Sequence, residues 1–303
     1  MAAGALSTRL ERVAVANSLG VGAVHERTQA HFHVVMLYED SAGYAAAEGM
    51  GLSQIDTRAV ADRAAMKALQ GANPRHIRAE PMPAIFEPVA AAELLRPFVH
   101  GFSALAYQEQ RSFTCDLLGS KACAEQLNII DDAADPRTYT RPFDWEGVPK
   151  QRVELVREGV ISELLYDSYT AGREQPPRAS TGHAAPPPGR WGPVPENVIV
   201  LPGRESLDEL IASVDRGLLV SRVHYLNVVH PRKLILTGMT REGTFLIENG
   251  QTTHAVHNLR FTQPFVEALG RLQAMGADGE LHGGIWTPAL LIDGFCFTSE
   301  TQF

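Results

Sequence analysis

The sequence predicts an α+β fold, with a small mixed N-terminal part followed by a larger, mainly antiparallel β domain that contains a few helices. Three observations support this prediction. Before about residue 80, a hairpin pattern is followed by a helical one. Beyond residue 110 the apolar residues are spaced mostly as in strands. Near the end, Asn249-Gly250 separates two strand-like runs, and this dipeptide is typical of a tight β-hairpin turn.

The N-terminal part is predicted to be a hairpin followed by a helix. Residues 10–15 and 32–38 are strand-like, and Asn17-Ser18-Leu19-Gly20 between them has the composition of a turn. A stripe of apolar residues at four-residue spacing then predicts a helix, which Asp56 can cap and which runs to about Leu69.

A domain boundary is predicted near residue 80, where Pro81 and Pro83 follow the first helix. We therefore expect an N-terminal α+β domain over residues 1–80 and a β-rich C-terminal domain over residues 81–303. The chain is 45% hydrophobic and 20% charged, which supplies ample apolar material for buried cores.

Three helices are expected in the C-terminal part. One starts near Pro88, and Pro97 is expected to interrupt it because proline lacks an N–H and clashes with the preceding turn. The capping box of residues 206–209 opens a second helix. Apolar residues spaced over 265–272 predict a third.

The strands of the C-terminal part are marked by turns between apolar runs. Hairpins are predicted around Gly159 and around residues 249–250, and residues 288–297 form a closing strand. Between them, residues 175–196 hold seven prolines and are expected to form a long loop, either a lid or binding segment or a flexible linker.

Composition excludes several classes of function. A net charge of −8 and the absence of a basic run argue against nucleic acid as a partner. No apolar run reaches the ~18 residues that a membrane span needs, and residues 1–15 lack the apolar stretch of a signal peptide. The three cysteines form no CxxC motif, which fits reduced thiols and predicts a cytoplasmic protein.

One cluster of histidines superficially resembles a metal site. His25 and His31 are six residues apart in a strand-like segment, so they do not have the spacing that a helical zinc motif requires. His31 and His33 share one face of that strand. We interpret this face as a solvated strand face and not as a metal site.

The segment Ser180-Thr181-Gly182-His183 is the one part of the long loop that combines hydroxyls, a glycine and an imidazole. Ser180 and His183 could serve as nucleophile and base if tertiary structure aligned them. The segment could instead contact the backbone of a bound peptide, or could be ordinary loop composition. The residues themselves leave these alternatives open.

Several segments, in order, resemble the TldD/PmbA family, also called modulator of DNA gyrase proteins. The matching segments are residues 13–20, 128–132, 143–149, 159–171, 180–182, 197–210, 245–250 and 288–294. The resemblance makes Asp144, Glu146, Ser180, Thr181 and Gly182 candidates for peptide binding. Family members carry a longer N-terminal region, so residues 1–80 resemble a shortened first domain.

The resemblance implies a dimeric peptidase in which one subunit holds zinc through an HExxxH helix and a cysteine near its C-terminus. In this chain Arg96 stands where the first histidine would be, and Pro97 stands where the glutamate would be. His100 resembles a shifted remnant of the second histidine, and Met275 replaces the cysteine. We therefore expect a PmbA/TldE-like subunit with no metal of its own and zinc in a partner.

The function that the resemblance implies is that of a non-catalytic subunit in a TldD/TldE-like heterodimeric metallopeptidase. A TldD-like sister would supply zinc, and this chain would shape the peptide channel for proteolysis or for peptide and natural-product processing. One alternative is a non-enzymatic peptide-binding or regulatory protein that forms a homodimer. Another is a stand-alone amide hydrolase that uses Ser180 and His183 or a cysteine.

Overall fold

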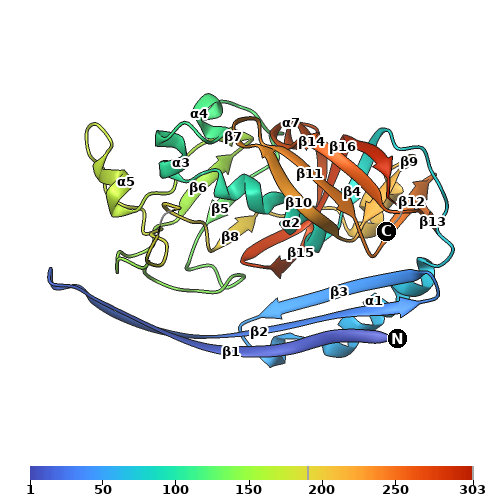
Figure 1. Ribbon diagram of the computed structural model, residues 1–303, viewed down its shortest axis with the longest axis horizontal. Helices are drawn as coiled ribbons and strands as arrows, with labels where there is room; N and C mark the ends of the chain where they lie inside the picture. Colours follow the sequence, from blue (N-terminus) through green and yellow to red (C-terminus); the bar gives the residue numbers. More distant parts are fainter. Residues whose placement is uncertain (190, 302–303) are drawn as a thin grey trace.

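The structure, a computed structural model, describes residues 1–189 and 191–301 and contains two sheets. Figure 1 shows the smaller sheet, with one helix, as a separate layer along one side of the larger part. The α+β class predicted from the sequence is confirmed. None of the helices in the described residues is long and apolar enough to cross a membrane.

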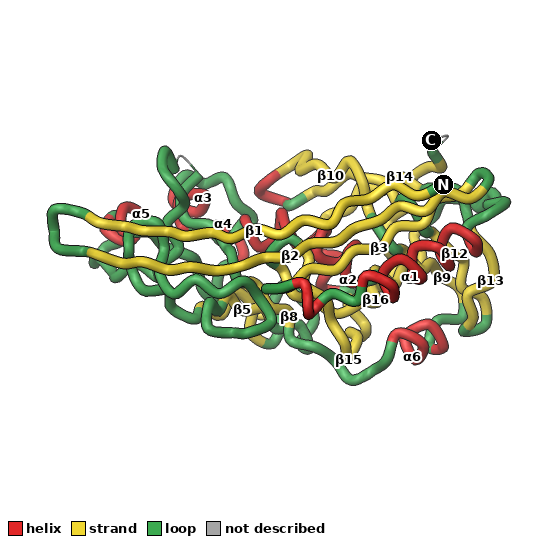
Figure 2. The backbone as a smooth tube through the Cα atoms, turned by 90° about the horizontal axis from the view of Figure 1, so that it is seen from below, coloured by secondary structure: helices red, strands yellow, loops and turns green. Residues whose placement is uncertain are grey.

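The N-terminal layer is an antiparallel sheet in the order β1-β2-β3. Its strands are β1 (Ala2–Ala16), β2 (Gly22–Tyr38) and β3 (Ser41–Gly49). The predicted turn closes the first hairpin, because the Asn17 side chain accepts hydrogen bonds from the backbone N–H groups of Leu19 and Val21 at 3.0 and 3.2 Å. The strands β1 and β2 extend well beyond β3 (Figure 2), and His25 near their tip lies 3.1 Å from the Thr140 carbonyl oxygen.

Helix α1 (Thr57–Gln70) covers one face of this sheet. Asp56 caps it as predicted, accepting from the backbone of Arg58 and Ala59. The strand β3 was not predicted, because its alanines and glycines lack the β-branched residues that mark strands. Those small residues have a packing role: a Cβ on Gly43 would lie 2.1 Å from the carbonyl oxygen of Ala64 in α1.

The C-terminal part is built on a thirteen-stranded sheet whose main path is β13-β12-β9-β4-β16-β8-β5-β6-β7. Most neighbours are antiparallel, and the pairs β16–β8 and β4–β9 are parallel. The strands are β4 (Pro81–Phe86), β5 (Ile129–Asp131), β6 (Val153–Arg157), β7 (Val160–Ile161), β8 (Val198–Val200), β9 (Arg216–Val220), β10 (Val223–His230), β11 (Ile235–Thr240), β12 (Thr244–Glu248), β13 (Gln251–Ala255), β14 (Leu259–Pro264), β15 (Leu272–His282) and β16 (Ile285–Glu300).

Short helices surround this sheet, and one longer helix packs into its core. The short ones are α3 (Ala104–Gln108), α4 (Thr114–Leu117), α5 (Ser168–Gly172), α6 (Leu207–Ala212) and α7 (Phe265–Gly270), with 3-10 turns η1 (Leu52–Gln54) and η2 (Pro231–Lys233). The longer one, α2 (Pro88–His100), buries eight side chains and contacts β16, β15 and β10.

The predicted interruption of α2 at Pro97 is wrong, since the helix continues to His100. Proline removes the hydrogen bond to the carbonyl four residues earlier. Packing outweighs this loss, because Leu94, Leu95 and Phe98 are completely buried around the proline. Burying side chains of this size stabilises the helix by about 1.5–3 kcal/mol each.

The predicted turns and caps elsewhere in the C-terminal part are confirmed. Glu158 and Gly159 connect β6 to β7 with positive φ, and Asn249 and Gly250 do the same between β12 and β13. Ser206 and Glu209 form the capping box of α6. The third helix is shorter than predicted, since α7 ends at Gly270 and β15 follows. No helix or strand falls within the described part of residues 175–196.

Candidate functional site

The four-residue spacing of Arg96 and His100 puts both side chains on one face of α2. This face forms one wall of a hollow of about 520 Å³, which we call the α2–β10 hollow. Glu93, Arg96, Pro97 and His100 line it from α2, and residues 223–228 line it from β10. Four positions of this chain correspond to zinc-site positions in the family resemblance. Three of them, Arg96, Pro97 and His100, line this hollow.

Arg96 enters this hollow with few partners. Its Nη1 donates to the Gly283 carbonyl oxygen at 3.1 Å, and within residues 1–189 and 191–301 it makes no ion pair. His100 is exposed to solvent but recessed in the hollow, where the surrounding protein, followed by the charge of Arg96, lowers its pKa. At neutral pH the helix face therefore presents one cation and one neutral imidazole.

Glu93 is the one carboxylate that lines the hollow among the described residues. Its Oε2 accepts from the backbone N–H of Val223 at 3.0 Å, and its Oε1 lies 3.7 Å from Nε of Arg222. Burial raises the pKa of Glu93 to about 7, although the Val223 hydrogen bond and the charges of Arg222 and Arg96 oppose this rise. Sequence reasoning missed Glu93 and Arg222, because no motif links a glutamate on α2 to the start of β10.

The fourth compared position, Met275, is buried in β15 and is absent from the described lining of the hollow. A guanidinium cannot ligate zinc, and proline has no side-chain donor atom. Among the described residues, no group of three or more His, Cys, Asp or Glu side chains is placed to hold a metal ion. The residues present on α2 therefore do not fit the zinc site of an HExxxH helix.

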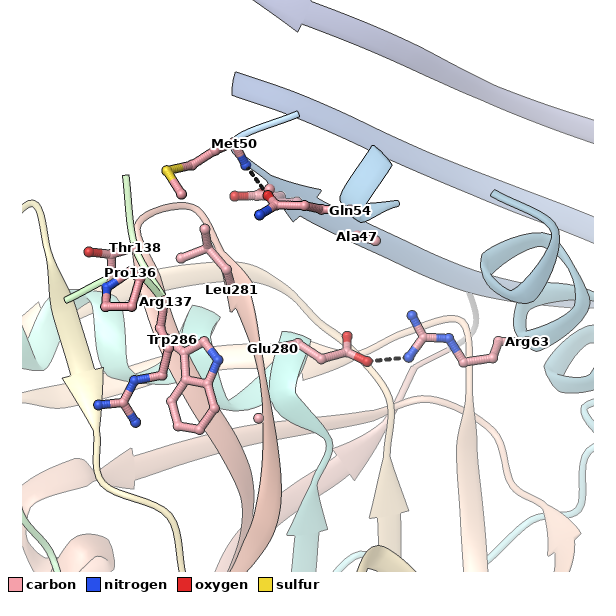
Figure 3. A pocket seen from close by; sticks show the side chains of 13 residues that line it. Ala47, Met50, Gln54, Arg63, Pro136, Arg137, Thr138, Glu280, Leu281 and Trp286 are labelled. Atoms are coloured by element: carbon pink, nitrogen blue, oxygen red, sulfur yellow. Dashed lines mark hydrogen bonds and ion pairs between the residues drawn. The ribbon is translucent and has the colours of Figure 1, made fainter. Parts of the chain in front are cut away.

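A second cavity, of about 350 Å³, lies between the N-terminal layer and the C-terminal part. We call it the interdomain cleft. Figure 3 shows Arg63 of α1 and Glu280 of β15 pointing toward one another across it, and these two form an ion pair. Arg137, held by Asp135, lies over the Trp286 ring at 4.7 Å from the ring centre. The cleft thus combines charged pairs with one aromatic surface.

The turn between β15 and β16 connects the hollow to the cleft. Its Gly283 N–H donates to both carboxylate oxygens of Glu48, at 3.0 and 2.9 Å, while its carbonyl oxygen accepts from Arg96. His31 Nε2 and His282 Nδ1 lie 3.8 and 3.6 Å from Glu48 Oε1. The prediction of a solvated strand face for His31 and His33 is therefore wrong, since both are half-buried at the interface between the two parts.

The loop segment Ser180–His183 is buried, and its two hydroxyl groups have hydrogen-bond partners. The Ser180 hydroxyl donates to the Tyr166 carbonyl oxygen at 3.0 Å and accepts from the Gly182 N–H at 3.0 Å. The Thr181 hydroxyl lies 2.9 Å from His183 Nδ1. The structure thus pairs His183 with Thr181, and the predicted neighbour Ser180 contacts other groups.

The imidazole of His183 also meets a carboxylate that the sequence did not single out as a site residue. His183 Nε2 lies 3.2 Å from Asp131 Oδ1, and both side chains are fully buried. Burial alone would raise the pKa of Asp131, but His183 and the charge of Lys150 outweigh this effect and lower the pKa to about 2. Asp131 also accepts from the N–H groups of Glu196 and Asn197, so it fastens the end of the long loop to β5.

The remaining two candidates for peptide binding also hold loops together. The Asp144 carboxylate is buried and accepts from the backbone of Glu146, Val148 and Ala184, each at 2.9 Å. The Glu146 carboxylate accepts from the Ser168 N–H at 3.0 Å. A direct contact of these residues with peptide stays a prediction.

The family of this protein follows from comparison with known sequences. Residues 79–299 match the family model described as the PmbA/TldA metallopeptidase C-terminal domain, which is more than half of the chain. The chain belongs to this family, and the resemblance predicted from the sequence motifs is confirmed.

Relatives of two kinds are similar to this chain. The metalloprotease PmbA homolog of Haemophilus influenzae is 27% identical over 238 residues, which cover 77% of this chain and 49% of the relative. The metalloprotease TldD homolog of the same species is 25% identical over 190 residues, which cover 61% of this chain and 38% of the relative. The chain therefore spans at most about half the length of these relatives.

A solved structure shares the fold. TldE from Thermococcus kodakarensis aligns with a TM-score of 0.87 at 22% identity, over 97% of this chain and 68% of that chain. At this level of identity the likeness shows a shared fold.

Proposed function

We propose that this protein is the metal-free subunit of a heterodimeric TldD/TldE-like metallopeptidase. A TldD-like sister subunit holds the zinc ion and the general base in this proposal, and this chain shapes the peptide-binding channel. The observation that carries the proposal is the composition of α2: Arg96 and Pro97 stand where a zinc subunit has its histidine and glutamate, and both face the α2–β10 hollow.

The proposal follows from what these side chains can do. A zinc hydrolase needs three or four ligands from nitrogen, oxygen or sulfur, together with a base that activates the bound water. Arg96 supplies a positive charge, which repels a metal ion, and Pro97 supplies no acid or base. His100 alone cannot hold a catalytic zinc ion. Hydrolysis therefore has to come from another subunit.

The role of this chain in such a complex is to bind and orient peptide. An exposed strand edge can pair with an extended peptide through backbone hydrogen bonds, so that recognition tolerates many sequences. The strand β10 pairs with β11 on one side and with no other strand in the described part of the chain. We place the complex in the cytoplasm, in keeping with three free cysteines, and assign it to proteolysis or to processing of peptides and peptide natural products.

Reconstitution tests this proposal. The chain is expressed alone, with a TldD-like protein encoded in the same genome, and with a variant of that protein whose HExxxH glutamate is replaced by glutamine. Cleavage of unstructured peptides is followed by mass spectrometry. We expect cleavage only for the pair with the intact sister, and its loss on chelation.

Two outcomes contradict the proposal. Chelator-sensitive cleavage by the isolated chain would place the chemistry in this subunit. A stable homodimer that never binds the sister would instead favour the non-enzymatic peptide-binding or regulatory alternative.

A further inference from the structure

The α2–β10 hollow has the size and lining of a ligand site. Its volume of about 520 Å³ falls within the range of roughly 300–1,000 Å³ typical of small-ligand pockets. Apolar surface comes from Pro97 and from Val223, Leu226 and Val228, while polar groups converge from α2. The hollow therefore combines an apolar lining with polar groups, as small-ligand sites do.

The charge that dominates the hollow belongs to Arg96. A guanidinium has five donor N–H groups, and among the described residues that of Arg96 makes only the hydrogen bond to Gly283. Arginine binds carboxylates and phosphates through two parallel hydrogen bonds. Arg96 is thus a cation with donors to spare in a lined cavity.

The other titratable groups in the hollow leave this positive charge in place. Glu93 is engaged by the Val223 N–H and approached by Arg222, and burial raises its pKa to about 7, so it is partly protonated at neutral pH. The pKa values of His100 and His224 are lowered, chiefly because the surrounding protein disfavours their charged forms. The hollow therefore attracts a singly charged anion at neutral pH, and one guanidinium matches one carboxylate.

The backbone of β10 supplies the second feature. The hydrogen bond from the Val223 N–H to Glu93 shows that the edge of β10 opposite β11 faces α2 and the hollow. A bulge interrupts the pairing with β11 between His224 and Asn227, and Tyr225 at this bulge has a φ of 50°. Tyr225, which lines the hollow, and Val229, beyond it, are 67% and 61% exposed, so β10 is accessible to solvent at both places. The N–H and C=O groups along an unpaired strand edge can pair with an extended chain.

We propose that the α2–β10 hollow binds the C-terminal end of an extended peptide, with its terminal carboxylate on Arg96 and its backbone along the edge of β10. A peptide that pairs along the edge of β10 would end at Arg96, and the group at its C-terminal end is a single carboxylate. This inference deepens the proposed function by naming which end of the peptide this subunit would hold.

The test compares two forms of one peptide on the full chain. An uncharged peptide of about seven residues, labelled at its N-terminus, is made with a free C-terminal carboxylate and with a C-terminal amide, and binding is followed by fluorescence anisotropy. We expect the free acid to bind at least about tenfold more tightly than the amide, because a hydrogen-bonded charge is lost. Arg96→Gln removes this preference, whereas Arg58→Gln, at a side chain that is 92% exposed on α1, preserves it.

A second variant guards against a folding defect in Arg96→Gln. Val228→Asp adds a negative charge to the hollow at a position that is 42% exposed, where the substitution leaves the core untouched. We expect it to weaken binding of the free acid about tenfold or more and to leave binding of the amide unchanged. An equal effect on both peptides contradicts the inference.

Other results overturn the inference without touching the proposed function. These are equal affinity for acid and amide, absence of binding by the chain both alone and with its sister, or Arg96-dependent binding of an amidated peptide through an internal glutamate. A zinc-containing, active heterodimer that shows any of them retains the proposed function and loses this site. If the chain prefers the free acid over the amide but never pairs with a zinc sister, the binding site is retained and the proposed function is lost.

Discussion

Two regions of this protein contain polar and titratable side chains that differ in burial and in the number of their partners. In the Ser180–His183 segment, hydroxyl, imidazole and carboxylate groups are buried and paired with one another or with backbone. In the α2–β10 hollow, Arg96 and His100 face solvent-accessible space with few protein partners. Residue types alone therefore do not mark a binding site. Groups whose partners are all internal stabilise the fold, and groups left with spare donors can bind a ligand.

The largest loss of stability is expected for a substitution in the buried region. Asp131→Asn removes a charge that accepts two backbone hydrogen bonds and meets His183 at 3.2 Å. We expect the free energy of unfolding to fall by about 3 kcal/mol, as for other broken buried pairs, in urea denaturation at pH 7. Asp62→Asn, at a side chain that is 68% exposed, is the matched control and should change stability by less than about 0.5 kcal/mol.

The pH dependence of the wild type sharpens this prediction. The pKa of Asp131 is about 2, below its ordinary value of 3.8, so the folded state favours the ionised form. The resulting stabilisation is present above about pH 4 and is lost as the pH falls through 2; it amounts to about 2 kcal/mol. Asp131→Asn should flatten this part of the stability curve, and an unchanged curve contradicts the assignment.

A smaller effect is expected from Thr181→Val. The Thr181 hydroxyl accepts from the Tyr166 N–H at 2.8 Å and lies 2.9 Å from His183 Nδ1, so valine leaves both groups unpaired in the interior. We expect a loss of about 2 kcal/mol in thermal or urea unfolding, and no change in peptide affinity. Normal stability with impaired peptide cleavage by the reconstituted complex would instead support a direct role of this segment in chemistry or peptide contact.

Unlike the two substitutions above, Glu93→Gln should increase the free energy of unfolding at high pH. Because the folded-state pKa of Glu93 is raised to about 7, its contribution to stability is full below about pH 4.5 and is lost as the pH rises through 7. Glutamine cannot ionise. With allowance for a side chain that is 21% exposed, the variant should be more stable than wild type by roughly 1–2 kcal/mol at pH 8 and equally stable at pH 5. Destabilisation at pH 8 argues against the raised pKa.

The smallest change in stability is expected for Arg96→Gln. Its hydrogen bond to Gly283 is exposed and no ion pair is lost among the described residues, so unfolding should shift by no more than about 0.5 kcal/mol. A loss comparable to that of Asp131→Asn would mean that Arg96 is a structural residue. It would also break the contrast between the two regions.

The parts of the fold that local chemistry determines could be predicted from the sequence. Side-chain caps at Asp56 and Ser206 and the turns at Gly159 and Asn249-Gly250 depend on neighbouring residues only. The continuity of α2 through Pro97 could not be predicted, because distant side chains packed around the helix outweigh a local defect.

The candidate site was predictable only in part. The family resemblance pointed to Arg96 and His100, and the structure places them in one cavity. Glu93 and β10 complete that cavity through contacts between segments about 130 residues apart, as the bond between Glu93 and Val223 shows. Such pairings leave no mark in local composition, and for the same reason the burial of His183 against Asp131 was not foreseen.

Metal content tests the central proposal most directly. The complex of this chain with its TldD-like sister is purified, and zinc is quantified for the complex and for each isolated subunit after dialysis. We predict one zinc ion per heterodimer, one per isolated sister and none on this chain. Stoichiometric zinc on this chain, lost on substitution of His100, would contradict the proposal.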